Sequence, residues 1–253
     1  MMEPQGPKVA LVTGASRGIG RAIALGLAAR GYAVAINDIE RQQQELQRVA
    51  DAIAAACGTA FVAVADVSKK AEVQAMVSAV VSKFRRIDAV VNNAGILIAS
   101  GVEEMPEETW DAVLDVNAKG TFLVSQAVLP VMKMQSYGRI VNIASIGGKH
   151  GAPMQAHYSA SKAAIMGFTR VLAQEVGELG VTANCVCPGI IYTDMGRVNL
   201  DDPAIREVWR EKTALRRIGD PEDVVGAVAF FASDDAAFIT GQSLNVDGGI
   251  VLS

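Results

Sequence analysis

Short apolar runs alternate with amphipathic stretches along most of the chain. The apolar runs predict strands at 8–13, 32–38, 59–66, 88–95, 137–145, 181–189 and 242–249. Apolar residues at helical spacing predict helices that begin near Gly18 and over 41–56, 69–84, 107–135, 155–178 and 221–232. Because strands separated by helices imply right-handed crossovers and a parallel sheet, the pattern predicts an α/β fold.

Glycine or polar residues stand where successive predicted strands end. They are Gly14, Asp38, Asp66 and Asn93. The ligands of open parallel sheets bind beyond the carboxyl ends of the strands. We therefore expect a binding site at that edge.

The first predicted strand runs into a glycine loop and then a helix. The loop reads T-G-x-x-x-G-x-G, with Gly14, Gly18 and Gly20, and so differs from the G-x-G-x-x-G dinucleotide fingerprint. Strand, loop and helix N-terminus nevertheless offer free N–H groups and the positive end of a helix dipole. This arrangement suits a phosphate.

Asp38 bears on the choice of dinucleotide. An acid at the end of the second strand accepts hydrogen bonds from the adenosine ribose hydroxyls and repels a 2′-phosphate. Arg17 in the glycine loop favours the opposite choice, because a guanidinium pairs with phosphate. We give Asp38 more weight and expect NAD rather than NADP.

Ser145, Tyr158 and Lys162 form a candidate device for proton transfer. On a helix over 155–178, Tyr158 and Lys162 are one turn apart and share a face. A phenol ionises near pH ~10, and a neighbouring ammonium is expected to lower that pKa by favouring tyrosinate. Ser145, at the end of the fifth strand, is placed to hold a substrate oxygen near the phenol. The set suits an alcohol/ketone pair.

Composition narrows the class of protein. The chain has 253 residues and a formal net charge of −4, and it is 51% hydrophobic but only 5% aromatic, which suits buried strands under alanine-rich helices. The acidic balance gives no reason to expect nucleic acid or an anionic membrane as a partner. We find no secretory signal, bilayer-spanning run, linker or repeat, and expect one domain over 1–253 in the cytoplasm.

The three cysteines are expected to be reduced thiols. Cys185 and Cys187 alternate on an apolar strand and so face the same side of the sheet, whereas Cys57 lies elsewhere. Because no histidine or further cysteine stands at metal-binding spacing, no metal is expected.

Three regions leave alternatives open. Residues 190–219 are weakly patterned, which predicts a substrate lid whose Met195 and Trp209 either wall the site or pack within the lid. His150, in the polar loop GGKHG, is interpreted first as a solvated residue and alternatively as pocket lining. Asn117, in the middle of a predicted helix, is expected to kink it, to position a water, or simply to be tolerated.

Together these motifs resemble the short-chain dehydrogenase/reductase family over nearly the whole chain. They are TGASRGIG (13–20), DV (66–67), NNAG (92–95), Asn117, Ser145, Y-x-x-x-K (158–162), PG (188–189) with Thr193, and DGG (247–249). The resemblance implies a single doubly wound Rossmann-type domain, with a seven-stranded parallel sheet flanked by helices on both faces. It also implies a homotetramer.

The resemblance further implies a role for each matched residue. Tyr158 is the expected acid/base, Lys162 its partner and a ligand of the nicotinamide ribose, Ser145 the residue that orients the substrate oxygen, and Asn117 the anchor of a water-linked proton relay. Together with Tyr158 and Lys162, the residues expected to bind the dinucleotide are Gly14, Ser16, Arg17, Gly18, Ile19, Gly20, Asp38, Asp66, Val67, Asn93, Ala94, Gly95, Pro188, Gly189, Ile191 and Thr193.

The expected function is NAD(H)-dependent interconversion of a secondary alcohol (a small alcohol, diol, polyol or sugar) and its ketone. The alternative is a 3-oxoacyl-[acyl-carrier-protein] reductase using NADPH, which would need basic residues to dock an acidic carrier protein. QEVGELG (174–180) instead has two acids and no base, and the preceding long helix ends with only Lys133. Outside enzymes, the alternative is a nucleotide-binding regulatory protein, which would not need Tyr158 and Lys162.

Overall fold

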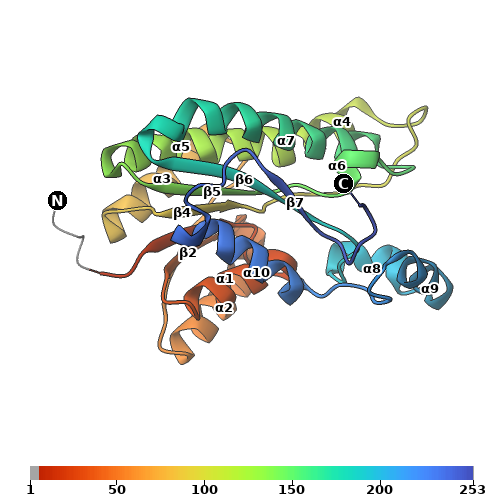
Figure 1. Ribbon diagram of the computed structural model, residues 1–253, viewed down its shortest axis with the longest axis horizontal. Coiled ribbons are helices and arrows are strands. Elements are labelled where there is room, and N and C mark those ends of the chain that lie inside the picture. The colour runs from red at the N-terminus through yellow and green to blue at the C-terminus, as the bar shows by residue number, and fades with distance from the viewer. Residues whose placement is uncertain (1–5, 253) are drawn as a thin grey trace.

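A computed structural model describes residues 6–252 and shows one seven-stranded sheet in which every strand pairing is parallel (Figure 1). The strand order is β3-β2-β1-β4-β5-β6-β7. This confirms the doubly wound α/β fold. The strands are β1 (Val9–Thr13), β2 (Ala33–Asp38), β3 (Thr59–Val64), β4 (Ala89–Asn92), β5 (Gly138–Ile143), β6 (Val181–Pro188) and β7 (Ser243–Val246).

Helices cover both faces of the sheet (Figure 1). One face carries α1 (Gly18–Ala28), α2 (Gln43–Ala55) and α10 (Pro221–Ala232), and the other carries α3 (Lys70–Phe84), α5 (Gly120–Gln135) and α7 (Ala156–Val176). Successive residues of β1 enter opposite cores, because Val12 packs with the α1 side and Leu11 with the α3 and α5 side. Full burial of each such aliphatic side chain contributes about 1.5–3 kcal/mol.

The strand order reverses between β1 and β4, which are hydrogen-bonded neighbours. From β1 the chain winds outward through β2 to β3, and then crosses back to β4 before continuing to β7. Such a reversal opens a crevice beyond the carboxyl ends of the two central strands. Gly14 follows β1 there and Asn93 follows β4.

The helix predicted over 107–135 is interrupted. The structure has α4 (Glu107–Leu114), then a π-helical turn at Asp115–Lys119, then α5. Asn117 lies in the wide turn, so its expected disturbance of the helix is confirmed. The signal was the low helix propensity of asparagine, whose side chain competes for backbone partners.

Three short helices were missed from the sequence. GGKH, expected as a loop, forms the single turn α6 (Gly147–His150), and the Gly147 N–H donates to Ser145 Oγ at 3.0 Å. Within 190–219 the chain forms α8 (Asp194–Leu200) and α9 (Pro203–Lys212). Their caps were readable, since Thr193 and Asp202 side chains accept from backbone N–H groups and Pro203 occupies the first turn of α9.

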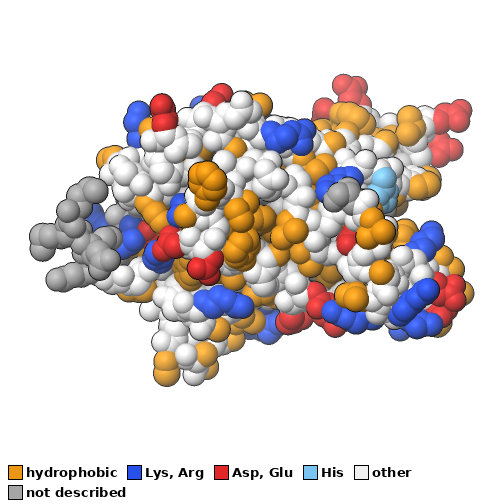
Figure 2. Space-filling model, viewed as in Figure 1, with side chains coloured by type: hydrophobic (Ala, Val, Ile, Leu, Met, Phe, Trp, Pro, Cys, Tyr) orange, Lys and Arg blue, Asp and Glu red, His pale blue; other side chains and the backbone are white. Residues whose placement is uncertain are grey.

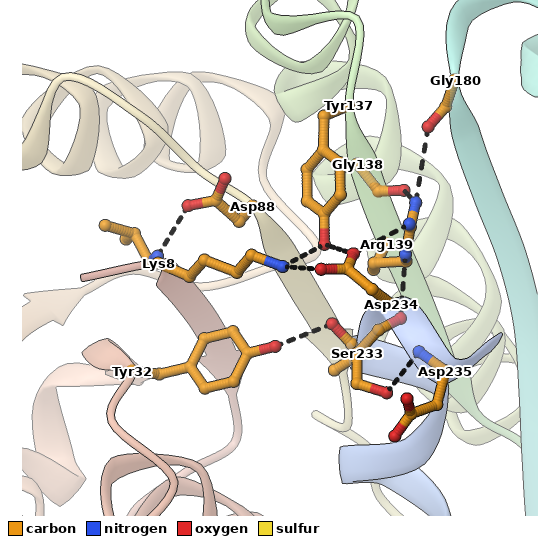
Figure 3. A network of polar contacts seen from close by, with 12 residues as sticks. Lys8, Tyr32, Asp88, Tyr137, Gly138, Arg139, Gly180, Ser233, Asp234 and Asp235 are labelled. Atoms are coloured by element: carbon orange, nitrogen blue, oxygen red, sulfur yellow. Dashed lines mark hydrogen bonds and ion pairs between the residues drawn. The ribbon is translucent and has the colours of Figure 1, made fainter. Parts of the chain in front are cut away.

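At the amino end of the sheet, a polar network ties the start of β1 to β5 and to the segment after α10 (Figure 3). Lys8 Nζ donates to Asp234 at 2.6 Å and to the Tyr137 hydroxyl at 2.9 Å. The Tyr137 ring also contacts two cations, with Lys8 Nζ 4.8 Å and the Arg139 guanidinium carbon 4.3 Å from its centroid. This network lies at the opposite edge from Gly14 and Asn93, and we interpret it as structural.

Among residues 6–252, no helix combines the length and the apolar character needed to cross a bilayer. The three cysteines are free, as expected, and Cys185 and Cys187 share a buried cluster with Met166 on the α7 side of the sheet. In the same described range, no group of His, Cys, Asp and Glu is arranged to hold a metal ion.

Candidate active site

The glycine loop packs so tightly that side chains would not fit in it. A Cβ at Gly20 would lie 2.1 Å from the Gly14 carbonyl oxygen, and one at Gly14 would lie 2.8 Å from Ala94 Cα. Gly14 and Gly18 also adopt φ values of 64° and 53°, which favour glycine. The loop therefore brings bare backbone to the crevice between β1 and β4.

The first turn of α1 keeps its N–H groups available. Arg17 is the N-cap residue, and its side chain makes no capping hydrogen bond. Because the first N–H groups of a helix lack intrahelical partners, Gly18, Ile19 and Gly20 present donors and the positive end of the helix dipole to the loop. This is the donor set that a pyrophosphate requires.

Asn93 braces the loop from the neighbouring strand. Its Nδ2 donates to the Thr13 and Gly14 carbonyls, each at 3.0 Å, while its own N–H and that of Ala94 donate to Thr13 Oγ1. The sequence placed Asn93 at the adenosine ribose. The structure shows instead that its amide donor is used to hold the loop, and the ribose contact stays a prediction.

The Asp38 carboxylate is also tied to the glycine loop. Ser16 Oγ donates to Asp38 Oδ2 at 2.6 Å, and the Ile39 N–H donates to Oδ1 at 2.9 Å. Arg17, the residue that favours NADP, is exposed and forms a long ion pair with Asp194 at 3.9 Å. Ser16 thus fixes the direction in which Asp38 offers its oxygens, a contact that sequence reasoning missed.

Asp66 and Val67 follow β3, at the same edge of the sheet as Asp38 and Asn93. Asp66 Oδ1 accepts from the Ser68 hydroxyl and N–H, at 2.7 and 3.0 Å. Burial opposes ionisation of Asp66, yet these hydrogen bonds and the charge of Lys69 hold its pKa below the usual value. Val67 is buried against Gly120, where a Cβ would lie 2.8 Å from Val67 Cγ2.

Ser145, Tyr158 and Lys162 meet beyond the end of β5. A Cβ at Gly147 would lie 3.3 Å from Ser145 Oγ and 3.7 Å from Tyr158 Cε1, so the hydroxyl and the phenol ring border the same small space. Lys162 Nζ lies 5.6 Å from the centroid of the Tyr158 ring. The shared face predicted for the last two residues is therefore present in α7.

Lys162 is almost completely buried, and its ammonium has a backbone partner. Nζ donates to the Ile143 carbonyl at 2.8 Å. Burial lowers the pKa of Lys162 to about 8, an effect that the nearby Cys185 and Cys187 sulfurs only partly oppose. A Cβ at Gly95 would lie 3.5 Å from Lys162 Nζ, so Gly95 borders the same space.

The expected lowering of the Tyr158 pKa by Lys162 is not found for the polypeptide. Burial raises the pKa of Tyr158, and a hydrogen bond with Ser145 offsets this only in part. The reason is that desolvation disfavours both the phenolate and the ammonium, while Nζ is engaged by Ile143. At neutral pH the Tyr158 hydroxyl is therefore a proton donor.

Asn117 links the π-helical turn to α7 and to the chain after β4. Its Nδ2 donates to Ser161 Oγ and to the Ile96 carbonyl, each at 3.0 Å, and its Oδ1 accepts from the Ile96 N–H at 2.8 Å. The side chain is completely buried and its polar atoms are paired. Ser161 and Ile96 were missed from the sequence, although Ser161 precedes Lys162 directly.

The segment after β6 closes the opposite side of the crevice. Pro188 ends β6, and Gly189 lies so close to Asp247 that a Cβ would fall 2.6 Å from that residue's Cβ. Ile191 is buried, and the methyl group of Thr193 lies 3.5 Å from where a Cβ of Gly18 would stand. Thr193 Oγ1 accepts from the Gly196 N–H at 3.2 Å.

A cavity of about 540 Å³ lies against the segment that joins Ser145 to Tyr158. The segment between Ser145 and Tyr158 forms one wall, α9 a second and the chain end a third. It is lined by His150, Gly151, Ala152, Pro153, Gln155, Ile205, Trp209, Lys212, Ile250 and Val251. Trp209 is thus a wall residue, and His150 lines the cavity as the alternative interpretation held, whereas Met195 is exposed and is not part of this lining.

The residues present fit a dinucleotide. The loop between β1 and α1 is a cradle that any side chain at Gly20 would fill, and the free N–H groups of α1 face it. An acid follows β2, and the buried Lys162 borders Gly95 at the far side of the crevice. The predicted residues thus converge at one edge of the sheet, while their individual contacts with a cofactor stay predictions.

Comparisons with known proteins identify the family of the chain. A family model described as enoyl-(acyl carrier protein) reductase matches residues 14–251. A 3-oxoacyl-[acyl-carrier-protein] reductase of Synechocystis sp. is 45% identical over 246 residues, which are 97% of each chain. The (2S)-[(R)-hydroxy(phenyl)methyl]succinyl-CoA dehydrogenase subunit BbsD of Thauera aromatica is 42% identical over 242 residues, 96% of each chain.

A solved structure extends the likeness to the fold. A protein of Agrobacterium tumefaciens, assigned as a gluconate dehydrogenase, superposes with a TM-score of 0.94 at 31% identity over 98% of each chain. The names of relatives at 42–45% identity favour the alternative expectation, a 3-oxoacyl reductase, over the small-alcohol dehydrogenase that we placed first. With its sheet, glycine loop and Ser145–Tyr158–Lys162 cluster, the chain belongs to the short-chain dehydrogenase/reductase family of NAD(P)-dependent oxidoreductases.

Proposed function

We propose that this protein reduces the ketone of a 3-oxoacyl thioester to the corresponding alcohol. The observation that carries the proposal is the meeting of Ser145, Tyr158 and Lys162 at the carboxyl edge of the sheet, where the segment that joins Ser145 to Tyr158 also lines a cavity. The 45% and 42% identical relatives, whose printed names both refer to acyl thioesters, support this substrate class.

When bound, the nicotinamide supplies the hydride that reduces the ketone carbon. Ser145 Oγ donates a hydrogen bond that orients the ketone oxygen, and the Tyr158 hydroxyl gives its proton to that oxygen as negative charge develops. The raised pKa of Tyr158, caused mainly by burial, keeps the phenol protonated at neutral pH. This protonation state favours the reducing direction.

Lys162 and Asn117 serve the proton-transfer residues in this proposal. Lys162 holds the nicotinamide ribose and stabilises the tyrosinate left after the proton is given. Asn117 positions the turn that carries Lys162, because its amide bonds Ser161 in α7 and both backbone groups of Ile96. In this proposal Asn117 also anchors a water-linked relay that returns a proton to Tyr158.

For the dinucleotide we propose NAD(H). Asp38 offers carboxylate oxygens whose direction is fixed by Ser16 and by the Ile39 N–H. A 2′-phosphate would meet this charge, whereas ribose hydroxyls would donate to it. Fluorescence titration with NADH and NADPH is the test, and tighter binding of NADPH would show that Arg17 dominates instead.

The acyl group of the substrate is carried either by coenzyme A or by a carrier protein. Glu175 lies in the last turn of α7 and Glu178 in the short turn that follows it, while the exposed bases are Arg170 in α7 and Lys133 near the end of α5. This mixed charge gives an acidic carrier protein little electrostatic advantage. Coenzyme A is therefore the carrier we expect to be used at least as well as a carrier protein.

The deciding experiment measures turnover with both reduced cofactors on acetoacetyl-CoA, an acetoacetyl carrier protein and simple polyol-derived ketones. We expect thioesters to be reduced with the highest kcat/KM. Tyr158→Phe should lower turnover by roughly 10²–10⁴-fold while retaining NADH binding. Preference for the polyol-derived ketones would restore the small-alcohol function, and near-normal turnover by the phenylalanine variant would remove Tyr158 from its role.

NADH binding without turnover of any substrate would favour the regulatory protein. The Asn117, Ser145, Tyr158 and Lys162 set argues against that outcome, since a nucleotide sensor has no use for a proton donor.

We also propose that the protein assembles as a homotetramer in which α8 and α9 act as the substrate lid. Apolar side chains are exposed on two separate faces: Trp110, Phe122 and Val171 on the side of α4, α5 and α7, and Phe238 and Leu244 near β7. Hydrophobic side chains also gather over the centre of the face drawn in Figure 2, where β7 and α10 lie. Two such faces on one chain suit a dihedral assembly, and sedimentation at micromolar concentration tests the state.

A further inference from the structure

The cavity against the segment that joins Ser145 to Tyr158 carries a positive charge, that of Lys212. Its titratable lining residues are His150 and Lys212, and none of the lining residues that the structure describes is acidic. This contrasts with the chain as a whole, whose formal net charge is −4. A basic, otherwise mainly apolar cavity in an acidic protein is suited to an anion.

Lys212 is directed to the cavity by its place on α9. Ile205, Trp209 and Lys212 follow one another at helical spacing and all line the cavity, so α9 presents an aliphatic, an aromatic and a cationic residue on one face. Lys212 Nζ lies 4.6 Å from the centroid of the Trp209 ring. The indole therefore holds the ammonium over the wall by a cation–π contact.

The ammonium has capacity left for a ligand. Within residues 6–252, no carboxylate forms an ion pair with Lys212, whereas Arg210, two residues before it on α9, pairs with Glu207. An ammonium has three donors, and a π-face engages only its charge. The alternative is a purely structural role, in which Lys212 complements the negative end of the α9 dipole. That role would affect helix stability but not substrate choice.

His150 adds a second polar group to the opposite wall. Its Nδ1 lies 2.8 Å from the Gly151 carbonyl oxygen, which can only accept, so Nδ1 carries a proton. The same hydrogen bond fixes the orientation of the ring at the cavity. His150 ends α6 in the segment that joins Ser145 to Tyr158, so this wall is connected at both ends to residues of the proposed proton-transfer site.

We propose that Lys212 is a specificity-determining residue that receives an anionic group of the substrate, separate from the ketone that is reduced. This inference rests on the proposed function and adds a second recognition point to it. Two sources supply such an anion: a carboxylate at the far end of the acyl chain, or a phosphate on the carrier arm. A charge-assisted hydrogen bond accounts for recognition in both cases.

The end of the molecule formed by α8 and α9 is consistent with this assignment. On the face drawn in Figure 2, hydrophobic side chains there are interleaved with Lys and Arg and with Asp and Glu. The acids of α9 are Glu207, paired with Arg210, and Glu211, whose carbonyl accepts from Arg216. Neither acid lines the cavity.

The test compares three thioesters. Acetoacetyl-N-acetylcysteamine carries no anion, 3-oxoadipyl-N-acetylcysteamine carries a carboxylate on the acyl end, and acetoacetyl-CoA carries phosphates on the carrier. Lys212→Gln should raise KM by about tenfold or more for at least one anionic substrate, the usual effect of losing a charge-assisted bond. It should leave kcat/KM for the neutral thioester within about twofold.

Arg210→Gln is the matched control, since it removes the same charge from the same helix outside the cavity. Lys212→Arg should restore KM. An effect on the CoA ester alone identifies the phosphate as the anion, and an effect on the oxoadipyl ester alone identifies the carboxylate. Equal effects on all three substrates, or no effect, would overturn the proposal.

A binding measurement separates this inference from the proposed function. The chain has two tryptophans, so in a Trp110→Phe background Trp209 is the remaining one and its fluorescence reports on the cavity. CoA or adipate should change that fluorescence in the Lys212 protein, and binding should weaken by about tenfold in Lys212→Gln. If no thioester is reduced while this binding persists, the proposed function fails and the anion site remains.

Discussion

Lys162 Nζ donates a 2.8 Å hydrogen bond to the Ile143 carbonyl, joining α7 to the last residue of β5. The ammonium is buried, and burial lowers the pKa of Lys162 to about 8 from 10.5. A charge placed where it is disfavoured costs stability. The fold tolerates this cost at the point where α7 also presents Tyr158, as the proposed proton-transfer role of Lys162 requires.

We therefore expect Lys162→Met to stabilise the protein near pH 7 while it removes activity. Because the folded-state pKa of this base is depressed, the unfolded chain binds the extra proton between pH 8 and 10.5. The penalty is complete below pH 8 and is relieved as pH rises through that window. Its upper bound is roughly 3.4 kcal/mol, from 1.36 kcal/mol for each pKa unit between 10.5 and about 8, and the lost bond to Ile143 reduces the net gain.

Urea unfolding of both proteins at pH 7 and pH 10 checks this expectation. The advantage of the variant should shrink by more than half at the higher pH. Lys70→Met, at an exposed lysine at the start of α3, is the control and should show no such change. A variant that is less stable than the parent at pH 7 would mean that the bond to Ile143 outweighs the desolvation of the ammonium.

Replacement of Gly20 tests the phosphate cradle. The Cβ of Gly20→Ala would lie 2.1 Å from the Gly14 carbonyl oxygen, so the backbone of the loop must move. In the parent protein, NADH at about 100 times its Kd should add about 2.7 kcal/mol of stability. We expect Gly20→Ala to lose most of this gain in a thermal-shift titration.

Gly226→Ala is the matched glycine variant for that experiment. No atom stands within 4 Å of a Cβ at Gly226, which lies inside α10. The change should add about 0.5–1 kcal/mol of stability through helix propensity and leave the NADH response intact. Full NADH-induced stabilisation of Gly20→Ala would contradict the assignment of this loop to the cofactor.

The strands and the residues at their carboxyl ends were predictable because short stretches of sequence determine both. Gly14, Asp38, Asp66 and Asn93 each follow an apolar run, and parallel topology alone brings them to one edge. Tyr158 and Lys162 were predictable in the same way, from one turn of one helix. Burial of valine, isoleucine and alanine on both faces of the sheet enforces that topology.

What the sequence did not yield are contacts between residues distant in the chain. Ser161 meets Asn117 only after the π-helical turn brings α7 and the chain after β4 together, and Ile143 meets Lys162 through a backbone carbonyl that no sequence pattern marks. The sign of the Tyr158 shift was also missed, since it depends on desolvation and not on the nearest charge. The cation of Lys212 was overlooked because α9 was not recognised as a helix.

The ion pair between Arg217 and Asp223 predicts an acid-dependent contribution to stability. Arg217 donates to both carboxylate oxygens, and Asp223 also accepts from the Asp220 N–H at 2.8 Å in a capping box at the start of α10. These bonds lower the pKa of Asp223 to about 2 from 3.8. Its stabilisation is present above pH 3.8 and is lost as pH falls through 2.

Asp223→Asn should therefore cost about 1 kcal/mol at pH 7, a figure reduced for the half-exposed Arg217. Most of the difference from the parent should be lost by pH 2, which acid unfolding followed by circular dichroism will show. Combining the change with Arg217→Gln should cost little more than either change alone, because the two residues share one interaction. A difference that persists unchanged at pH 2 would assign the effect to the cap rather than to the charge.

His157 is completely buried beside Tyr158, and neither ring nitrogen has a hydrogen-bond partner among the described residues. Buried polar atoms without partners cost about 1–3 kcal/mol each, so an apolar side chain of similar volume should be favoured there. We expect His157→Leu to raise the free energy of unfolding by up to about 2 kcal/mol and to leave turnover unchanged. His150→Leu, at an exposed histidine, is the stability control.

A loss of stability in His157→Leu, measured by urea unfolding at pH 8, would show that the imidazole holds a partner such as a buried water. The position next to the proton donor would then be part of its support, and turnover should fall together with stability.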